Sequence, residues 1–377
     1  MAQNFSIEQI LGYVTLSEMI ETIANGVPDP LPPEFTLEGE EVIGDATRYI
    51  KATGTRAVPH LVQYGAPPVR RALRPLSSTD VKLLSVAEEQ PIDALTMSRL
   101  RSPNSYERDT GYKEVLANVE RFGTLFGNFE IATRLLTLAN GRLGFDSSGN
   151  LLPDSSYSGA AEQVSMGINA SNQGQLPYNG VNIATAPWNL NATDIPLQIR
   201  NLRKRAVQQT GVKLTHAIYG VNIPSYITQN DFCVDYMARN PIMQAEFLRT
   251  GEVPAGFCDL IWVPAYEAFW DTDDLGAATS HQAIWGDDLC VFTPDPALRG
   301  LQQWWACAKG STVVPTSLSI ATNAMTALDD TVLKFGRYGY GTINPYGPGV
   351  GLKTVMGDVF LYYLKNADAI YQMTTVF

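Results

Sequence analysis

The chain has 377 residues, of which 45% are apolar and only 17% charged, and its formal net charge is −11. This apolar content excludes a wholly disordered chain, and the acidic balance argues against tight nonspecific binding of nucleic acid over the whole surface. The charged fraction lies below the roughly 25% of typical globular proteins. It therefore indicates either secretion or an outer face that partners largely cover.

The N-terminal residues lack the basic start and apolar stretch of a signal peptide, and no segment approaches the ~20 consecutive apolar residues of a membrane helix. We therefore expect a protein that is made and used in a cytoplasm, with no membrane partner. The four cysteines, Cys233, Cys258, Cys290 and Cys307, include no Cys-x-x-Cys pair. Buried free thiols are the expected state.

Residues 1–57 show little period beyond a short amphipathic start from Ile7 to Ile23. Four prolines between residues 28 and 33 then impose an extended run, because each fixes its own φ and biases its predecessor away from helix. We expect an extended arm that cannot bury itself and that is either disordered or laid across something else. Together with residues 58–98, it is predicted to bury most of its surface on neighbouring subunits.

Residues 58–98 are predicted to form an elongated hairpin, with Val58–Tyr64 in one strand and Val81–Val86 in the returning one. Its tip carries three arginines, Arg70, Arg71 and Arg74. Two interpretations of this cluster remain open. It is either a solvated loop tip or an inter-subunit contact, since arginines are suited to bidentate pairing with carboxylates.

A long amphipathic helix is predicted over residues 110–139. Apolar residues recur there at steps of three, four or seven, and they are the candidate core of this helix: Val115, Val119, Phe122, Phe126, Phe129 and Leu136. Asn140-Gly141 ends the helix, because glycine readily takes the left-handed conformation of a helix C-terminus. A short polar turn follows, with two apolar segments on either side of it, Arg142–Phe145 and Asn150–Leu152. This pattern predicts a tight hairpin.

Residues 153–192 are expected to be mostly loop, with a short strand at Gln163–Ile168. A helix capped by Thr193 is predicted to run to about Gln209. Its basic face is expected to be solvated and consists of Arg200, Arg203, Lys204 and Arg205.

From residue 212 to 330, strand-like and helix-like segments alternate and predict a compact α+β module. The strands are Leu214–Tyr219, Leu260–Val263 and Leu289–Phe292, and the helix is Pro224–Met237. Two apolar runs close the chain, Val355–Leu364 and Ala369–Val376. They predict paired C-terminal strands.

Motifs of catalysis and cofactor binding are missing. There is no P-loop, no Gly-x-Ser-x-Gly elbow and no His-Glu-x-x-His, and the three histidines are far apart in the sequence. Gly347–Gly351 contains a proline and precedes no helix, and Asp271–Gly276 is not followed by the bidentate glutamate of a calcium loop. We expect no catalytic, cofactor-binding or metal-binding residues, and no cofactor.

The order of these parts resembles the major capsid protein of tailed bacteriophages, of the lambda head-protein type. The resemblance is strongest in Val58–Leu152, Phe257–Val263, Asp288–Leu301 and Val355–Ala369. It implies an α+β capsid fold with an N-terminal arm, an extended two-stranded E-loop, a P-domain with a long spine helix, and an A-domain. The implied bounds are 1–57 for the arm, 58–98 for the E-loop, 99–185 for the P-domain, 186–335 for the A-domain and 336–377 for C-terminal strands that return to the P-domain and A-domain.

The resemblance further implies a structural protein of the virion that self-assembles into the icosahedral head shell of a tailed phage. Hexamers and pentamers of one chain would enclose double-stranded DNA without binding it specifically. Assembly in the host cytoplasm is expected, and separate scaffolding, portal and decoration proteins are candidate partners. Two alternatives stay open. One is an encapsulin-like nanocompartment shell, which tends to be shorter and to carry an N-terminal helix in place of the arm, and the other is a soluble enzyme without a recognisable motif.

Overall fold

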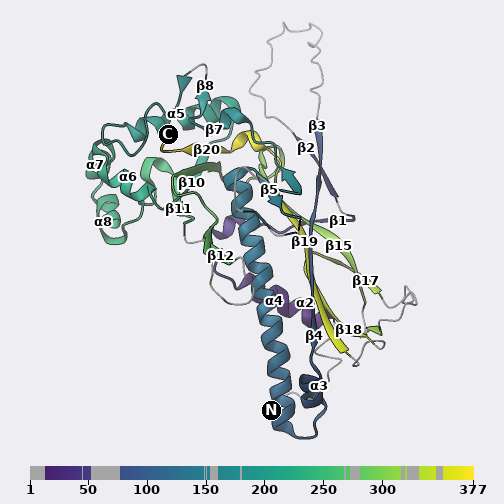
Figure 1. Ribbon diagram of the computed structural model, residues 1–377. Helices are drawn as coiled ribbons and strands as arrows, with labels where there is room; N and C mark the ends of the chain where they lie inside the picture. Colours follow the sequence, from purple (N-terminus) through teal and green to yellow (C-terminus); the bar gives the residue numbers. More distant parts are fainter. Residues whose placement is uncertain are drawn as a thin grey trace, which may run out of the picture.

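One very long helix runs beside a seven-stranded sheet in the computed structural model, and a second lobe of helices and strands lies at one end of this pair (Figure 1). The structure describes residues 13–44, 46–51, 77–147, 149, 151–152, 160–178, 181–266, 269–271, 281–315, 319–320, 331–344 and 351–377. Among these residues the α-helices are α2 (Tyr13–Asn25), α3 (Ala94–Arg101), α4 (Ser105–Asn140), α5 (Ile195–Gln209), α6 (Ile223–Gln229), α7 (Asp231–Ala238) and α8 (Pro241–Thr250).

The long helix α4 begins and ends at residues that satisfy its free backbone groups. The side chain of Asn104 accepts a hydrogen bond from the backbone N–H of Tyr106, so the helix starts five residues before the predicted residue 110. Gly141 closes the helix with a φ of 66°, a left-handed conformation that glycine adopts without strain. The predicted end at Asn140-Gly141 is confirmed.

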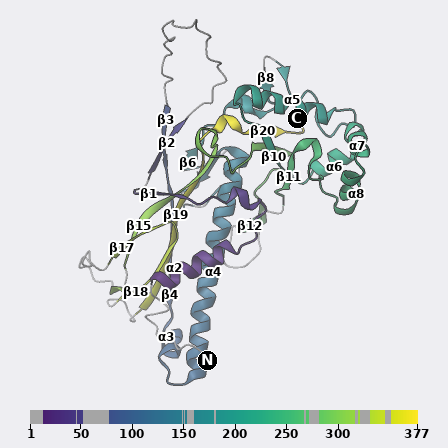
Figure 2. The same ribbon diagram turned by 180° about the vertical axis from the view of Figure 1, so that it is seen from behind.

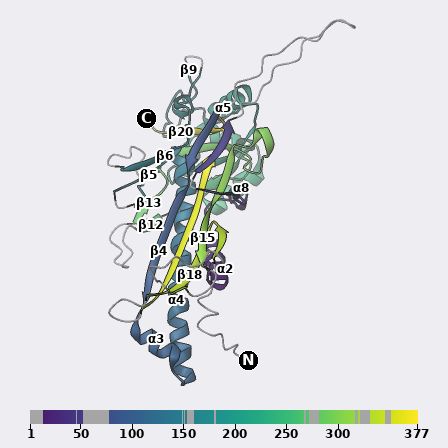
Figure 3. The same ribbon diagram turned by 90° about the vertical axis from the view of Figure 1, so that its right-hand side faces the viewer.

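The seven-stranded sheet is built around its longest strand, β19. Its members are β1 (Glu40–Val42), β4 (Leu84–Ile92), β15 (Trp305–Pro315), β16 (Ser319–Ile320), β17 (Thr331–Phe335), β18 (Tyr338–Asn344) and β19 (Gly351–Leu364). β19 pairs antiparallel with β4, β15 and β18, and β17 pairs with β15. Figure 3 shows β4, β15 and β19 running along α4. Residues 305–315 and 331–335, which the sequence grouped with the range 186–335, thus share a sheet with residues 351–364.

Helix α2 packs against α4 and β18 of its own chain, as the two opposite views in Figures 1 and 2 show. Leu16 and Ile20 of this helix are fully buried, as is Phe35 in the short helix η1 (Pro33–Phe35). The expectation that the N-terminal arm cannot bury itself is therefore wrong for this part of it. The cause is that its apolar residues fill a space between α4 and the sheet that a local pattern does not reveal.

A two-stranded stem, β2 (Ala46–Lys51) with β3 (Ser77–Lys82), leads away from the large sheet. The outgoing strand thus includes residues that the sequence assigned to the arm, and the predicted strand Val58–Tyr64 lies outside the described residues. The predicted return at Val81–Val86 is divided at Leu83 between β3 and β4, and β4 belongs to the large sheet.

The predicted hairpin after α4 has a different partner. β5 (Arg142–Phe145) pairs with β6 (Glu162–Ser165). Of the expected partner Asn150–Leu152, Asn150 lies outside the described residues, and Leu151 forms an isolated bridge with Phe145. A more distant strand therefore takes most of the backbone hydrogen bonds of β5.

The second lobe contains a five-stranded sheet in the order β11-β10-β14-β20-β7. These strands are β7 (Gln173–Gly174), β10 (Leu214–Tyr219), β11 (Ile261–Pro264), β14 (Leu289–Pro294) and β20 (Tyr371–Thr374). Two small hairpins accompany them, β8 (Pro177–Tyr178) with β9 (Val181–Asn182), and β12 (Phe269–Asp271) with β13 (His281–Ala283). The prediction that the two C-terminal apolar runs pair with each other is therefore wrong. The last run forms β20, which pairs with β14 and β7, and the run before it forms β19 of the large sheet, because each finds its backbone partners in a different lobe.

Two local details differ from the sequence prediction. The helix expected over Pro224–Met237 is divided into α6 and α7 at Asn230, whose side chain caps α7. Asp194, and not Thr193, caps α5. On the basic face of that helix Arg200 and Lys204 are exposed, but Arg205 is buried and donates to the backbone carbonyl of Ser171. The face is therefore only partly solvated.

Helix α4 has two differently buried halves. Up to Phe126 it buries one stripe, against α2, α3 and Met356 of β19. From Ile131 to Ala139 it is buried all round, between the two sheets. All four cysteines are buried and free, as predicted.

Candidate functional site

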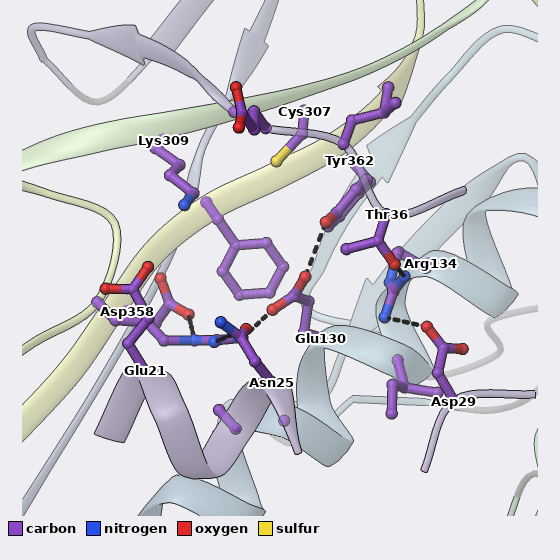
Figure 4. Close-up of a pocket in the computed structure, with 18 of the residues that line it drawn as sticks. Glu21, Asn25, Asp29, Thr36, Glu130, Arg134, Cys307, Lys309, Asp358 and Tyr362 are labelled. Atoms are coloured by element: carbon purple, nitrogen blue, oxygen red, sulfur yellow. Dashed lines mark hydrogen bonds and ion pairs between the residues drawn. The ribbon is translucent and has the colours of Figure 1, made fainter. Parts of the chain in front are cut away.

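A cavity of about 790 Å³ lies where the N-terminal segment, α4 and the large sheet meet (Figure 4). Polar and charged side chains dominate its walls: Glu21, Asn25, Asp29, Thr36, Glu38, Glu41, Glu130, Arg134, Lys309, Lys334, Arg337, Asp358 and Tyr362. Aliphatic and aromatic side chains normally fill the space between a helix and a sheet, so this concentration of charge is unusual. We call it the polar pocket.

Arg337 is the centre of the polar pocket. Its Nε lies 2.9 Å from Oδ2 of Asp358, its Nη1 donates to Oδ1 of Asn25 at 2.9 Å, and its Nη2 forms an ion pair with Glu130. The hydroxyl of Tyr362 donates to the other oxygen of Glu130 at 2.7 Å. These contacts connect α2, α4, β19 and the turn before β18. They hold segments that are more than 300 residues apart in the sequence.

Arg134 forms the second group of contacts in the pocket. Its Nη2 pairs with Asp29 at 2.7 Å and its Nη1 donates to Thr36 at 2.7 Å, as Figure 4 shows. Its guanidinium also lies over the ring of Tyr362, 5.2 Å from the centroid. Because Asp29 lies within the proline-rich run and Thr36 just after it, this arginine fixes the segment that the sequence suggested to be an unsupported arm.

Burial governs the protonation of this network. Burial raises the pKa of Asp358 to about 7, although the neighbouring guanidinium of Arg337 acts in the opposite direction. Desolvation lowers the pKa of Arg337, but the charges of Glu130 and Asp358 outweigh it, so that pKa is raised. Burial also raises the pKa of the Cys307 thiol to about 12, so the thiol is protonated at neutral pH and is a poor nucleophile.

The structure places the predicted spine-helix residues on the inner side of α4. Val115, Val119, Phe122, Phe126 and Leu136 are buried, and Phe129 is half-buried with its ring edge-on to that of Phe360. The other predicted contact residues, Arg70, Arg71 and Arg74, lie outside the described residues.

Sequence reasoning missed the polar pocket. Asp358 gave the clearest signal, because a carboxylate inside the apolar run Val355–Leu364 needs a buried partner. Glu130 gave a similar signal within the apolar half of α4. Their shared partner Arg337 stands in a glycine-rich segment without periodicity, so the sequence did not single it out.

Large apolar side chains are exposed at several places on the described surface. The most exposed are Ile43, Tyr106, Ile242, Leu248 and Val313, with exposed fractions of 80, 78, 78, 77 and 60%. Helix α8 has no buried residue at all. Such surfaces are typical of proteins that bind partners. The described residues contain no helix that is long and apolar enough to cross a membrane and no His, Cys, Asp or Glu cluster that could hold a metal ion.

Comparison with solved structures identifies the fold. A candidate capsid protein of a prophage of E. coli CFT073 superimposes on this chain with a TM-score of 0.51, over 95% of this chain and 98% of that one, at 12% sequence identity. The chain has a phage-capsid fold. This α+β capsid fold includes both lobes, since the similarity extends over nearly the full length of the two chains. The fold class expected from the sequence is therefore confirmed.

Two further solved structures have lower similarity to the chain. A phage-related protein from Bordetella bronchiseptica RB50 has a TM-score of 0.44 at 10% identity, over 95% of this chain and 96% of that one. A virus-like particle from Pyrococcus furiosus has a TM-score of 0.40 at 9% identity, over 96% and 98% of the two chains. No protein-family model and no curated protein matches the chain.

Proposed function

We propose that this chain is the major capsid protein of a tailed phage. The observation that carries the proposal is the capsid fold, which covers 95% of the chain and leaves no additional domain among the matched residues. In this role, hexamers and pentamers of the chain build an icosahedral shell that encloses double-stranded DNA, and the shell is assembled in the host cytoplasm. Scaffolding, portal and decoration functions belong to separate proteins.

The surface of the described residues suits such an assembly. Exposed apolar side chains occur on β15, on α8 and near the start of α4, so each copy offers several separate contact regions. A shell subunit needs this arrangement, because it touches several neighbours at once, whereas a closed dimer needs only one self-complementary patch.

On this proposal the parts of the chain take the roles that the resemblance implies. Helix α4 is the spine of the P-domain, the stem β2–β3 is the base of the E-loop, and the lobe that contains α5–α8 is the A-domain. The polar pocket then has a structural role, because its ion pairs hold the N-terminal segment against the spine helix and the C-terminal strand.

Particle formation tests the proposal. We expect the purified chain, expressed alone or with a scaffolding protein from the same genome, to sediment as large particles and to form closed shells in negative-stain micrographs. A chain that remains a monomer or small oligomer at high concentration under both conditions would contradict it and favour the soluble enzyme.

An encapsulin-like nanocompartment remains the second candidate. One observation favours it, namely that an N-terminal helix, α2, packs on the spine helix. The content of the particles separates the two functions. Nuclease-protected DNA in particles from phage-producing cells supports the capsid, and a co-purifying enzyme inside tail-less particles supports the nanocompartment.

A further inference from the structure

A second cavity, of about 250 Å³, lies where the end of α5 meets two short helices, η2 (Ala170–Asn172) and η6 (Ala367–Ala369). Helix η6 joins β19 of the large sheet to β20 of the second lobe. All the described residues that line this cavity have polar side chains: Asn169, Ser171, Asn172, Gln209, Thr210, Asn366 and Asp368. Four of the seven are carboxamides, which both donate and accept hydrogen bonds. We call this cavity the amide pocket.

Arg205 fixes the orientation of the side chains in this wall. Its guanidinium is buried, and its Nη2 donates to the backbone carbonyl of Ser171 at 2.7 Å and to Oδ1 of Asn172 at 2.9 Å. Its Nε donates to Oε1 of Gln209 at 3.2 Å, and the hydroxyl of Tyr371 donates to the same oxygen at 3.0 Å. Because the oxygen of Gln209 is held in this way, its amide nitrogen is left to bind another acceptor. The wall is therefore oriented before any ligand arrives.

Three side-chain amides of the pocket have unused hydrogen-bonding groups. Asn366 is only 6% exposed, yet its Oδ1 accepts no hydrogen bond within the described part of the chain. The side-chain nitrogens of Gln209 and Asn169 have no acceptor among the same described residues. A buried amide oxygen without a partner is costly, because it has lost its hydrogen bonds to water. The pocket thus offers donors and an acceptor to a ligand.

The chemistry of the wall argues against several classes of ligand. Of the described residues that line the pocket, only Asp368 is charged, so an anion finds no cation there. A metal ion is disfavoured because the described residues contain no cluster of His, Cys, Asp or Glu that could hold one, and because Arg205 already occupies the oxygens of Asn172 and Gln209. An apolar ligand finds no aliphatic or aromatic side chain among these lining residues. A neutral ligand with many hydrogen-bonding groups fits best.

We propose that the amide pocket binds a single sugar ring. Each hydroxyl of a sugar both donates and accepts, so neighbouring hydroxyls match Oδ1 of Asn366 and the amide nitrogens of Gln209 and Asn169. A peptide backbone spreads its donors and acceptors along an extended chain and needs a groove. At roughly 30 Å³ per water molecule, the pocket is also much larger than the site of one or two structural waters. This sugar site is independent of the proposed shell function.

Ligand-observed NMR with the full-length chain tests the proposal. Saturation transfer from the protein is measured to D-glucose, D-galactose and D-mannose in turn, and titrations give the dissociation constants. We expect at least one of these sugars to bind with a dissociation constant of about 1 mM, as is ordinary for a small ligand held by a few hydrogen bonds. Inorganic phosphate and Ca²⁺, added as competitors, should not displace it.

Substitutions locate the binding. Gln209→Leu removes the amide at an exposed position of α5 and should weaken binding at least about fivefold, which corresponds to the loss of one hydrogen bond. Asn201→Leu makes a similar change at an exposed position of α5 outside the pocket and should leave the affinity unchanged. Asn366→Leu should abolish binding. Asn169→Leu, also exposed, is the further lining variant if either of the other two lining variants does not fold.

Three results would overturn the proposal. They are the absence of saturation transfer to all three sugars, equal affinities of the lining variants and the unmodified chain, and displacement of the sugar by phosphate or Ca²⁺. A chain that forms no shells would contradict the proposed function but not the sugar site, because the amide pocket lies within one subunit and the NMR measurement needs no assembly.

Discussion

Gly127 of α4 lies directly beneath Val27, so closely that a Cβ atom at Gly127 would come within 2.6 Å of Cγ2 of Val27 and 2.8 Å of the carbonyl oxygen of Ala24. One turn earlier, Gly123 faces Ile23 in the same way, at 2.7 Å. The two glycines form a notch in the spine helix. The end of α2 and the residues after it can lie on α4 only because these two positions have no side chain.

Filling the notch should therefore displace the N-terminal segment. Gly127→Leu is expected to lower the free energy of unfolding by about 1–3 kcal/mol through overpacking, although leucine is the better helix former by nearly 1 kcal/mol. Asn128→Leu, on the exposed side of the same turn, is the matched control and should have little effect. Denaturant titration followed by circular dichroism measures both, and equal stabilities would contradict the notch.

The apolar stripe of α4 should not tolerate a charge. Phe122 is 7% exposed and packs with α2 and α3, so Phe122→Asp places an unpaired carboxylate in this cluster and is expected to prevent soluble folding. Asn128→Asp makes a similar change on the exposed side of the helix. A normal soluble yield of Phe122→Asp, compared with Asn128→Asp, would refute the role of the stripe.

Removing Arg337 should be far more costly than removing an exposed arginine. The side chains of Arg337 and Asp358 are 9% and 4% exposed and that of Glu130 is 16% exposed, so Arg337→Met leaves one buried and one partly buried carboxylate without their cation and is expected to cost about 3–5 kcal/mol. Arg48, whose side chain is 70% exposed in its pair with Asp80, is the control, and Arg48→Met is expected to have little effect because water screens an exposed ion pair. Similar losses for the two variants would argue against a special role of the polar pocket.

Asp358 should make stability depend on pH. Its pKa is about 7 in the folded chain, above the ordinary value of 3.8, so the folded state binds this proton more tightly than the unfolded state. The contribution is fully present below the unfolded pKa and falls as the pH rises toward 7, by up to about 1.4 kcal/mol per pH unit. Asp358→Asn should remove this slope. Unfolding curves at several pH values between 5 and 8 would contradict the assignment if both proteins had the same slope.

The basic cluster of the loop should matter mainly at low salt. Replacing Arg70, Arg71 and Arg74 by alanine is expected to lower the melting temperature of assembled shells, because small contributions of about 0–1 kcal/mol per pair are repeated in every subunit. The difference from the unmodified shell should shrink as ionic strength rises and screens the pairs. Unchanged melting at low salt would indicate that the cluster is a solvated tip.

Local signals in the sequence were sufficient for the elements whose causes are local. The stripe from Val115 to Leu136 and the left-handed Gly141 predicted α4 and its end, since a helix depends on contacts between residues three or four apart and on the residue that closes it. The mostly apolar segments Val355–Leu364 and Leu214–Tyr219 indicated the strands β19 and β10 in the same way. The linear order of these parts was also enough to suggest the capsid fold.

The tertiary structure alone decided which distant segments meet. β5 pairs mainly with β6 and not with the residues just after the turn, α2 lies in the notch at Gly123 and Gly127, and Arg337 reaches Glu130 and Asp358. Each of these outcomes is a competition among segments far apart in the chain. The rest of the fold decides each competition, because it leaves a space of a certain shape, free backbone groups and unpaired charges that one segment satisfies best. A short stretch of neighbouring residues carries no information about these features.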